Sequence, residues 1–481
     1  MELKMKEVKI KRRSYGEHLT PIQIFEEFIL PEIKNQIYQY IWVDMFAGEG
    51  NLILPILNLV PEHERIEFFK KHIFLFDIQK ELVEKAIKNA TKYGIPLEVA
   101  QKNIRQRDSI KDYPVFLFDL GLPIYHITNP PYLYIGYIVK HPETQKHLDY
   151  FSGENAGYQD LYQLCLINDL RNSIKKMIYI IPSNFLFGFS VSNKIRNDFL
   201  PYYRIKKAII FEKEIFEFTG TNVIICFFER KDTPKHEVVS FEGIKINKEV
   251  QKKLYILGPK NRYRAGSEFE DFINSYRAIR PLQIKYYLTL EEVEKNKGPH
   301  EVEVLDVCNF SNGEYQKIKI FVNEYLFNKI KTNILFIRTV DTGGLSGQAG
   351  LYTIREVFNV DGLLVTKARY RTHPIQLFIE PRISIEEQIL LKDYFNLILG
   401  YFRKITDSEF MTTYKYSDSE YTRKYLGLSQ AKKLIETFPL LELNENEKSY
   451  FKYLIEAKKD AEEIINFILN ANKNKGLSTW L

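Results

Sequence analysis

The stretch Ile41–Gly50, with the sequence IWVDMFAGEG, decides the fold. Its first part, Ile41 to Phe46, is an apolar run typical of a buried strand. The two glycines that follow predict a turn into a helix over Asn51 to Val60, and they let the backbone approach a ligand closely. Structural turns of this kind are also common, so the G-x-G pattern by itself leaves cofactor binding open.

The segments around this stretch alternate between strand-like and helix-like patterns. Such alternation predicts an α/β fold with a doubly wound, mostly parallel sheet. Ligands of these sheets bind beyond the carboxyl ends of the strands. The predicted strands are Ile73–Phe76, Tyr125–Thr128, Met177–Ile181 and a closing antiparallel pair, Ile205–Phe211 and Val223–Phe228, and the predicted helices are Ile22–Ile29, Gln79–Tyr93 and Leu161–Ile174.

The sequence Asn129-Pro130-Pro131-Tyr132 (NPPY) follows the predicted strand Tyr125–Thr128. An amine conjugated to a ring is a poor nucleophile, so an enzyme that methylates it must hold acceptors against its N–H groups. The Asn129 side-chain oxygen and the Pro130 carbonyl can supply two, and the prolines stiffen the turn. Tyr132 offers a flat face to a planar substrate. The alternative is a strand-ending turn with an exposed tyrosine.

Three further patterns are ambiguous when each is taken alone. Asp77 ends a strand, where a carboxylate typically binds the ribose hydroxyls of a nucleoside cofactor, but a solvated loop aspartate is equally expected there. Asp108 follows a third strand and suits either an adenine amine or a helix cap. Thr20 and Pro21 suit the N-cap and first position of the helix Ile22–Ile29, which explains them without a ligand.

Together these patterns resemble the ordered motifs of gamma-class DNA adenine-N6 methyltransferases. The resemblance covers Gly16 to Arg230 and rests on the number and order of the matches. The matching motifs are Thr20-Pro21, Asp44–Gly50, Asp77, Asp108 and NPPY, followed by Gln159–Tyr162, Ile180–Leu186, and Glu214–Phe216 with Thr221–Val223, which look like the fifth, sixth and eighth motifs of the family.

The resemblance implies an S-adenosylmethionine-dependent methyltransferase fold and transfer of the methyl group to the N6 amine of a flipped-out adenine. Tyr132 and Phe216 would enclose the base. Glu49 departs from the common pattern and would face either the methionine ammonium or solvent. The implied catalytic residues are Asn129, Pro130, Pro131, Tyr132 and Phe216, and the implied cofactor-binding residues are Thr20, Pro21, Asp44, Phe46, Ala47, Gly48, Gly50, Asp77, Ile78, Asp108 and Asn129.

The second half of the chain changes character after Glu229–Pro234, a charged stretch that ends in proline. We therefore expect a catalytic domain over residues 1–234 and a mixed α+β target-recognition domain over residues 235–481. The tail, Glu445 to Asn470, has the pattern of an amphipathic helix. Basic residues among tyrosines are the expected DNA contacts, although a solvated surface is the alternative for each: Lys367, Arg369, Arg371, Arg423 and Lys424.

Composition limits the class of protein. The 481 residues, 45% hydrophobic and 27% charged, are ordinary for a soluble globular chain. The three cysteines have neither zinc nor disulfide spacing: Cys165, Cys226 and Cys308. We therefore expect no bound metal, and we expect the protein to occupy a reducing cytoplasm. The absence of a Pro-Cys dipeptide argues against a cytosine methylase with a cysteine nucleophile. No apolar run approaches the length of a membrane span.

The expected function is site-specific adenine methylation in a restriction–modification or defence system. A monomer that binds double-stranded DNA is expected, with a cognate restriction endonuclease as an optional partner. One rival acts on RNA amines or a protein glutamine amide, because NPPY provides the same acceptors for those reactions. The other rival is a non-catalytic specificity subunit, against which the full set of candidate catalytic residues argues.

Overall fold

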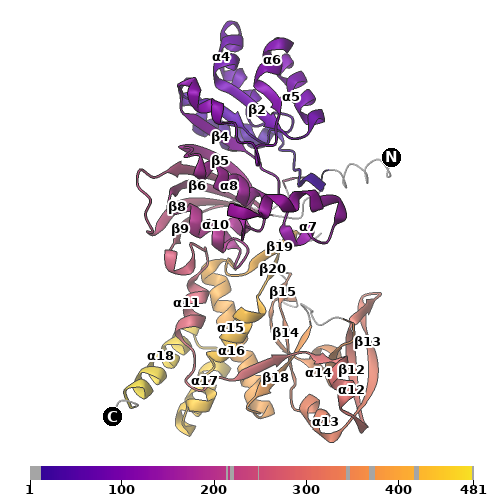
Figure 1. Ribbon diagram of the computed structural model, residues 1–481. Helices are drawn as coiled ribbons and strands as arrows, with labels where there is room; N and C mark the ends of the chain where they lie inside the picture. The colour runs from indigo at the N-terminus through magenta and orange to yellow at the C-terminus, as the bar shows by residue number, and fades with distance from the viewer. Residues whose placement is uncertain are drawn as a thin grey trace. The chain divides into compact units, whose positions relative to one another are not determined.

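The computed structural model describes residues 12, 14–212, 215–216, 222–247, 249–342, 347–367, 374–416 and 422–478. The chain divides into two compact units (Figure 1). The first contains Met1–Ala265 with Lys415–Thr422, and the second contains Gly266–Tyr414 with Arg423–Leu481.

Within the described residues, the first unit is built on a nine-stranded sheet of order β3-β2-β1-β4-β5-β7-β6-β8-β9. Its strands are β1 (Ile41–Asp44), β2 (Ile73–Asp77), β3 (Ile104–Gln106), β4 (Ile124–Thr128), β5 (Lys176–Pro182), β6 (Tyr203–Phe211), β7 (Val223–Arg230), β8 (Val239–Ile246) and β9 (Val250–Leu257).

The central strands are apolar because both faces of a parallel sheet are covered in this class of fold. β1, β2 and β4 are buried at every position. Trp42 on β1 lies opposite Ile73 of β2 on one side and Tyr125 of β4 on the other, with both pairings parallel. β7 lies antiparallel between β5 and β6. The predicted doubly wound, mostly parallel sheet with a closing antiparallel pair is therefore confirmed.

Helices α4, α5 and α6 pack on β1, β2 and β3 (Figure 1). In α5 the buried residues Leu82, Val83, Ala86 and Ala90 recur with the helical period, so one face of that helix is apolar. The helical segments of this unit are α2 (Ile22–Ile24), the π-helix η1 (Phe25–Ile29), α3 (Leu30–Ile33), α4 (Arg65–His72), α5 (Lys80–Lys92), α6 (Leu97–Asn103), α7 (Ile135–Ile138), α8 (Leu161–Arg171), α9 (Asn184–Phe187), α10 (Asn193–Phe199) and the 3-10 helices η2 (Lys34–Gln39), η3 (Leu54–Leu59), η4 (Glu62–Glu64), η5 (Val115–Leu120), η6 (Pro142–Phe151), η7 (Gly153–Asn155) and η8 (Pro259–Asn261).

The segment after the glycine turn differs from the sequence expectation. Instead of a helix over Asn51–Val60, the chain forms the 3-10 helix η3, which starts at Leu54. Ile53 has non-helical backbone angles, with a φ of −128° and a ψ of −45°, and Pro55 has no N–H to donate to the preceding turn. The turn therefore extends through residues 51–53 before a short, tight helix begins.

The first unit also extends beyond Pro234, where the sequence pattern placed the domain boundary. β8 pairs in parallel with β6, and β9 pairs antiparallel with β8, so both strands belong to the large sheet. The charged stretch Glu229–Pro234 is thus a connection within the first unit, and the division between the units lies at Ala265.

The second unit is mixed α and β. Its described part contains three small sheets, of order β10-β18-β14-β16, β11-β17-β12-β13 and β15-β20-β19. Its strands are β10 (Gln283–Tyr286), β11 (Leu288–Thr289), β12 (Lys297–Ser311), β13 (Glu314–Val322), β14 (Leu335–Arg338), β15 (Val340–Asp341), β16 (Gly350–Thr353), β17 (Gly362–Val365), β18 (Ile375–Glu380), β19 (Thr412–Tyr416) and β20 (Thr422–Tyr425).

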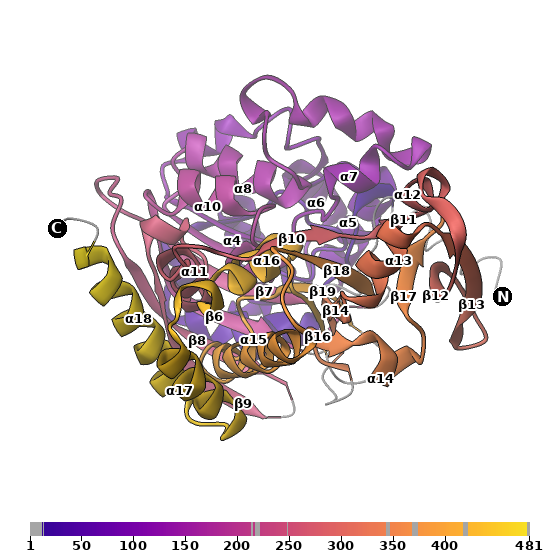
Figure 2. The same cartoon turned by 90° about the horizontal axis from the view of Figure 1, so that it is seen from below.

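The long helix α15 packs against β16 and α17, and α17 packs against α18 (Figure 2). The helix predicted over Glu445–Asn470 is in fact divided into α17 and α18, because Lys458 has a φ of +48° and interrupts it. No helix in the described ranges combines the length and apolar character needed to cross a membrane. The helical segments are α11 (Glu268–Ser275), α12 (Leu290–Lys295), α13 (Glu324–Lys331), α14 (Ile354–Phe358), α15 (Ile385–Thr406), α16 (Leu428–Glu436), α17 (Glu445–Glu456), α18 (Ala461–Ser478) and the 3-10 helix η10 (Leu440–Glu442).

Candidate active site

A pocket lies where the strand order reverses, between β1 and β4, which is where doubly wound sheets bind their ligands. Asp44 ends β1, Asp77 ends β2, and Asn129 follows β4, so three separate strand ends deliver polar side chains to one place. The pocket encloses about 830 Å³, including the part open to solvent.

The glycine turn brings the backbone close to Asp77. Gly48 has a φ of +53° and its N–H donates to Asp77 Oδ2 at 2.9 Å. The Gln79 N–H donates to Asp77 Oδ1 at 2.8 Å. Both oxygens of the carboxylate are therefore oriented by backbone amides. Burial raises the pKa of Asp77 to about 6, and the bonds from Gln79 and Gly48 partly oppose that rise.

Asp44 is the second buried carboxylate of the pocket. Its Oδ1 accepts hydrogen bonds from the Thr128 hydroxyl at 2.6 Å and the Phe46 N–H at 3.0 Å. Burial nevertheless raises the pKa of Asp44 to about 7. A carboxylate whose charge is disfavoured in this way attracts a cationic group placed beside it.

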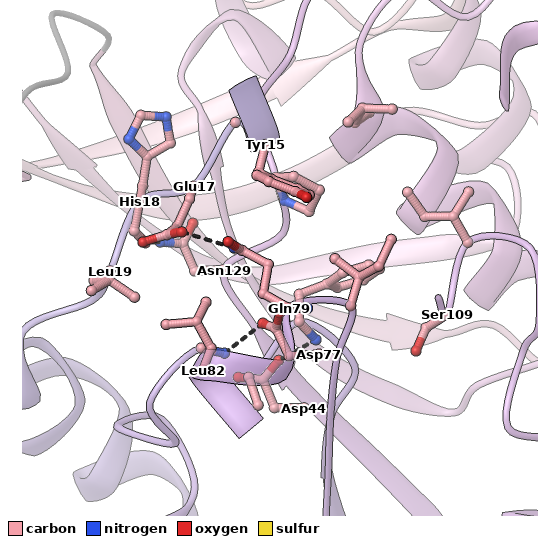
Figure 3. A pocket seen from close by; sticks show the side chains of 18 of the residues that line it. Tyr15, Glu17, His18, Leu19, Asp44, Asp77, Gln79, Leu82, Ser109 and Asn129 are labelled. Carbon is pink, nitrogen blue, oxygen red and sulfur yellow. Dashed lines mark hydrogen bonds between the residues drawn. The ribbon is translucent and has the colours of Figure 1, made fainter. Parts of the chain in front are cut away.

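The segment 14–20 forms another wall and is held to the strand ends by hydrogen bonds. The Asn51 amide donates to the Thr20 carbonyl at 2.9 Å. The Gln79 amide donates to Glu17 Oε2 at 2.8 Å, and the two side chains point toward one another in Figure 3. The Tyr132 N–H donates to the Gly16 carbonyl at 3.0 Å, which attaches the segment to the NPPY loop.

The same segment orients the Asn129 side chain. Asn129 Nδ2 donates to the His18 carbonyl at 2.7 Å and to Thr20 Oγ1 at 3.0 Å. Because these two hydrogen bonds fix the amide nitrogen of Asn129, they also fix the orientation of its side-chain oxygen, Oδ1. Asn129 Oδ1 accepts from the Tyr132 hydroxyl, which also lies 2.7 Å from the Ile180 carbonyl. A carbonyl oxygen accepts two hydrogen bonds, so Oδ1 retains capacity for another donor.

Tyr132 is more buried than a tyrosine that merely presents a face to solvent. It is 9% exposed, and burial raises the pKa of its hydroxyl well above the usual range. Its ring lies 4.8 Å, centroid to centroid, from the ring of His18. The ring of Phe216 also contacts that of His18, with a centroid distance of 6.2 Å. The two predicted base-enclosing rings therefore both contact one side chain of the 14–20 segment.

Asp108 and Glu49 complete the polar rim. Asp108 Oδ2 accepts from the Tyr150 hydroxyl at 2.8 Å. Glu49 lines the pocket, and its carboxylate lies 2.9 Å from the Lys85 ammonium on α5. Glu49, for which the sequence left two interpretations open, is thus directed to a lysine of its own domain.

The pocket wall includes most of the sequence-predicted site residues, namely Thr20, Asp44, Phe46, Ala47, Gly48, Asp77, Ile78, Asp108, Asn129 and Pro131. Five others lie outside it. Pro21 is exposed at the N-cap of α2. Gly50 lies under Leu54, whose Cδ1 would be 2.6 Å from an added Cβ. Pro130, Tyr132 and Phe216 are buried beside the pocket.

Sequence reasoning missed several wall residues, including Tyr15, Glu17, Gln79, Leu82, His147 and Tyr150. Glu17 and Gln79 each lie next to a recognised motif, and that adjacency was the available signal. His147 and Tyr150 lie on η6, which follows the NPPY loop, and no pattern marked them.

The predicted DNA-contact residues of the second unit differ in exposure. Lys367 is exposed after β17, and Arg423 is exposed on β20. Lys424 is only 7% exposed, and its ammonium donates to the Asp407 carbonyl at 3.0 Å. Lys424 is therefore engaged inside the protein, unlike the phosphate contact that the sequence suggested. Arg369 and Arg371 lie outside the described residues.

The donor set of the pocket fits S-adenosylmethionine. Asp77 presents an oriented carboxylate suited to vicinal hydroxyls, and Asp44 is suited to a cationic group. Ile78, Leu82 and Ile110 supply apolar surface for a flat base. The fold together with this pocket defines the class as that of S-adenosylmethionine-dependent methyltransferases.

The N-6 DNA methylase family model matches residues 3–304, which is more than half of the chain. The chain therefore belongs to the N-6 DNA methylase family. A search of curated protein sequences finds no match.

Several solved structures are similar. The type IIL restriction–modification enzyme MmeI, solved in complex with DNA, has 13% identity and a TM-score of 0.50 over 96% of this chain and 76% of that one. A modification subunit of a putative type I restriction enzyme from Vibrio vulnificus YJ016 has 15% identity and a TM-score of 0.35 over 72% of this chain and 61% of its own. The EcoKI M protein, of a type I restriction enzyme, has 13% identity and a TM-score of 0.35 over 65% of this chain and 64% of its own. The chain thus spans less than two thirds of the length of the last two.

Proposed function

We propose that this chain is a site-specific DNA methyltransferase of the gamma class, which transfers a methyl group from S-adenosylmethionine to the N6 amine of adenine in duplex DNA. The observation that carries the proposal is the orientation of Asn129. Two hydrogen bonds from Nδ2 hold this side chain at the edge of a pocket that also contains Asp44 and Asp77. Family membership and the order of the motifs along the chain support the same assignment.

Different pocket residues would bind different parts of the cofactor. Asp77 would accept from the ribose hydroxyls, while Ile78 would pack on the adenine and Asp108 would accept from its amine. Asp44 would hold the methionine ammonium, and its elevated pKa would fall once a cation is beside it. When bound, S-adenosylmethionine supplies an electrophilic methyl group on a sulfonium.

The NPPY loop acts on the nucleophile. Asn129 Oδ1 and the Pro130 carbonyl accept the two N–H groups of the target amine and draw its lone pair out of conjugation with the ring. Positive charge develops on the nitrogen during transfer, and the two fixed acceptors stabilise it. No strong base is needed, because the proton leaves after transfer. Pre-positioning of this kind can contribute several kcal/mol to lowering the barrier.

Access to the loop requires that the adenine leave the duplex. Flipping a base costs a few kcal/mol in lost stacking and pairing. Stacking on aromatic side chains contributes about 1–3 kcal/mol per base, which offsets this cost. Tyr132 and Phe216 are the rings that serve this purpose here, since both lie beside the Asn129 end of the pocket.

The second unit is proposed to select the DNA sequence. Its mixed α and β structure carries exposed basic residues, of which Lys367 and Arg423 are described and Arg369 and Arg371 are candidates from the sequence. A restriction–modification or defence system is the proposed setting, with a cognate endonuclease as a partner. The fold of MmeI resembles that of 96% of this chain, and MmeI was solved in complex with DNA.

The test is to express the chain in a host without adenine methylation and to sequence the genomic DNA with detection of methylated adenine. We expect N6-methyladenine at one recurring sequence. Asn129→Ala should leave the genome unmodified, whereas the matched control Asn172→Ala should not, because the Asn172 side chain donates to the Asn168 carbonyl at the end of its own helix. Label from S-adenosylmethionine appearing in RNA or protein, with none in DNA, would contradict the proposal.

A further inference from the structure

The His18 ring contacts two other aromatic rings beside the Asn129 end of the pocket. The His18 imidazole contacts Tyr132 in a tilted arrangement, at a centroid distance of 4.8 Å and an interplanar angle of 30°, and stacks on Phe216 at 6.2 Å and 29°. Both distances are within the range of interacting aromatic pairs. In Figure 3 the His18 ring points away from Asp44 and Asp77, so within the pocket that His18 also lines its ring is directed away from the two carboxylates.

We propose that His18 fills the adenine slot between Tyr132 and Phe216 when no base is bound, and that its ring is exchanged for the flipped adenine. This inference rests on the proposed function and deepens it, because it names the side chain that the base must displace. His18 is then a gate residue of the substrate site and contributes no atom to the transfer itself.

The chemistry of imidazole suits this role. It is a planar nitrogen-containing ring that stacks on tyrosine and phenylalanine in the same way as a nucleobase does. Burial, assisted by the nearby Arg12, lowers the pKa of His18 to about 4, so the ring is neutral at physiological pH. A neutral ring can be exchanged for a neutral adenine without leaving a charge uncompensated in the slot.

The backbone of the 14–20 segment allows the exchange to be a side-chain rotation. The His18 carbonyl accepts from Asn129 Nδ2 at 2.7 Å, and the neighbouring Gly16 carbonyl accepts from the Tyr132 N–H at 3.0 Å. Thr20 Oγ1 accepts from the same Asn129 amide. With these contacts in place, the ring can turn about its Cα–Cβ bond while Asn129 keeps the orientation that the reaction requires.

The exchange has a measurable consequence, because the base competes with a side chain that is already stacked. Removal of the ring should favour base entry, and a larger ring should oppose it. Since one aromatic pair is worth about 0.5–1.5 kcal/mol, the expected change in the flipped fraction is about two- to tenfold in each direction.

The experiment uses the whole chain and a duplex that carries 2-aminopurine in place of the target adenine, at the sequence identified by genome sequencing. Fluorescence in the complex should rise for His18→Ala and fall for His18→Trp relative to the parent. His141→Ala is the matched control, since the His141 ring stacks on Tyr137 at 3.8 Å, outside the slot. S-adenosylmethionine binding, measured by calorimetry, verifies that each variant is folded.

A second measurement needs no substitution in the slot. With histidine labelled in the parent chain, the His18 ring resonances should move when duplex is added, because the ring leaves the neighbourhood of two aromatic rings. Unchanged resonances, or the same fluorescence in His18→Ala, His18→Trp and parent, would overturn this inference. Those results in a chain that still methylates DNA would leave the proposed function intact, whereas a parent chain without methylation would overturn both.

Discussion

The Tyr132 N–H and the Gly16 carbonyl are joined by a hydrogen bond of 3.0 Å, which fastens the NPPY loop to a segment that precedes the first strand of the sheet. Gly16 has a φ of +65°, and a Cβ at this position would lie 2.6 Å from the Tyr132 carbonyl oxygen. The contact therefore requires glycine for two reasons: the left-handed backbone and the space.

Gly16→Ala should consequently impair the site. The left-handed conformation costs roughly 1 kcal/mol for alanine, and the clash with the Tyr132 backbone adds to it. Gly94→Ala is the matched control, because Gly94 has a φ of +85° but no described atom within 4 Å of an added Cβ. Thermal unfolding should show a loss in both variants, and methyl transfer should fall only in Gly16→Ala. Equal activity of the two variants would mean that the contact does not position the loop.

Asn129→Ala should separate turnover from cofactor binding. Loss of one of two fixed acceptors for a developing charge is expected to lower kcat about 10²- to 10³-fold. S-adenosylmethionine affinity should change little, because Asp44, Asp77 and Asp108 remain. Single-turnover kinetics and calorimetry on the same preparation measure the two quantities. A variant with near-normal turnover would remove Asn129 from the mechanism.

Asp44→Asn should stabilise the protein in alkaline solution. Burial raises the pKa of Asp44 from 3.8 to about 7, so between these values the folded state binds a proton that the unfolded state does not. The free energy of unfolding therefore falls as pH rises through this window, by up to about 1.4 kcal/mol per pH unit for this group. Asparagine retains an acceptor for Thr128 and Phe46 and has no charge to bury.

The urea denaturation midpoint of Asp44→Asn should thus exceed that of the parent at pH 8, and the difference should shrink toward pH 5. A difference that is constant with pH would show that the ionisation of Asp44 is not the cause. Measurements are made without cofactor, because a cation beside Asp44 would change its pKa.

Affinity for S-adenosylmethionine should decline as pH falls through about 6. The raised pKa of Asp77, caused chiefly by burial, means that this carboxyl becomes protonated there and is a weaker acceptor for ribose hydroxyls. Asp77→Asn should bind more weakly at pH 8 and lose the part of the decline near pH 6, whereas the part near pH 7 that Asp44 causes should remain. A parent chain whose affinity is flat from pH 5 to pH 8 would contradict the assignment of Asp77 to the ribose.

Charge removal in the second unit should flatten the salt dependence of DNA binding. Replacement of Arg369 and Arg371 by alanine should lower affinity, and each lost phosphate contact should reduce the slope of log K against log salt by about 0.9. Lys285→Ala is the control, since Lys285 is exposed but paired with Glu380 at 2.8 Å. A salt titration that is identical for the parent and the double variant would remove both arginines from the interface.

The central sheet was predictable because its strands are continuous apolar runs. IWVD and IFLFD form β1 and β2, and their terminal aspartates meet in the pocket because parallel strands end at one edge. β8 and β9 were not recognised, because they lie beyond a charged connection and alternate buried with exposed residues near the sheet edge.

Contacts between distant segments were beyond the reach of the sequence pattern. The contacts of His18 with both Tyr132 and Phe216 arise only when the 14–20 segment docks on the NPPY loop. Similarly, Lys424 has the sequence context of a surface cation. It is nevertheless buried, and its ammonium donates to the Asp407 carbonyl at the end of α15. Local periodicity carries no information about such pairings.

The 14–20 segment reaches the NPPY loop through hydrogen bonds and not through the path of the chain. The site therefore requires that the 14–20 segment be docked on the loop, and it does not require that this segment precede the loop in the sequence. A circular permutation that transfers this segment to another end of the coding sequence is compatible with the same chemistry, provided that the new linker reaches the loop.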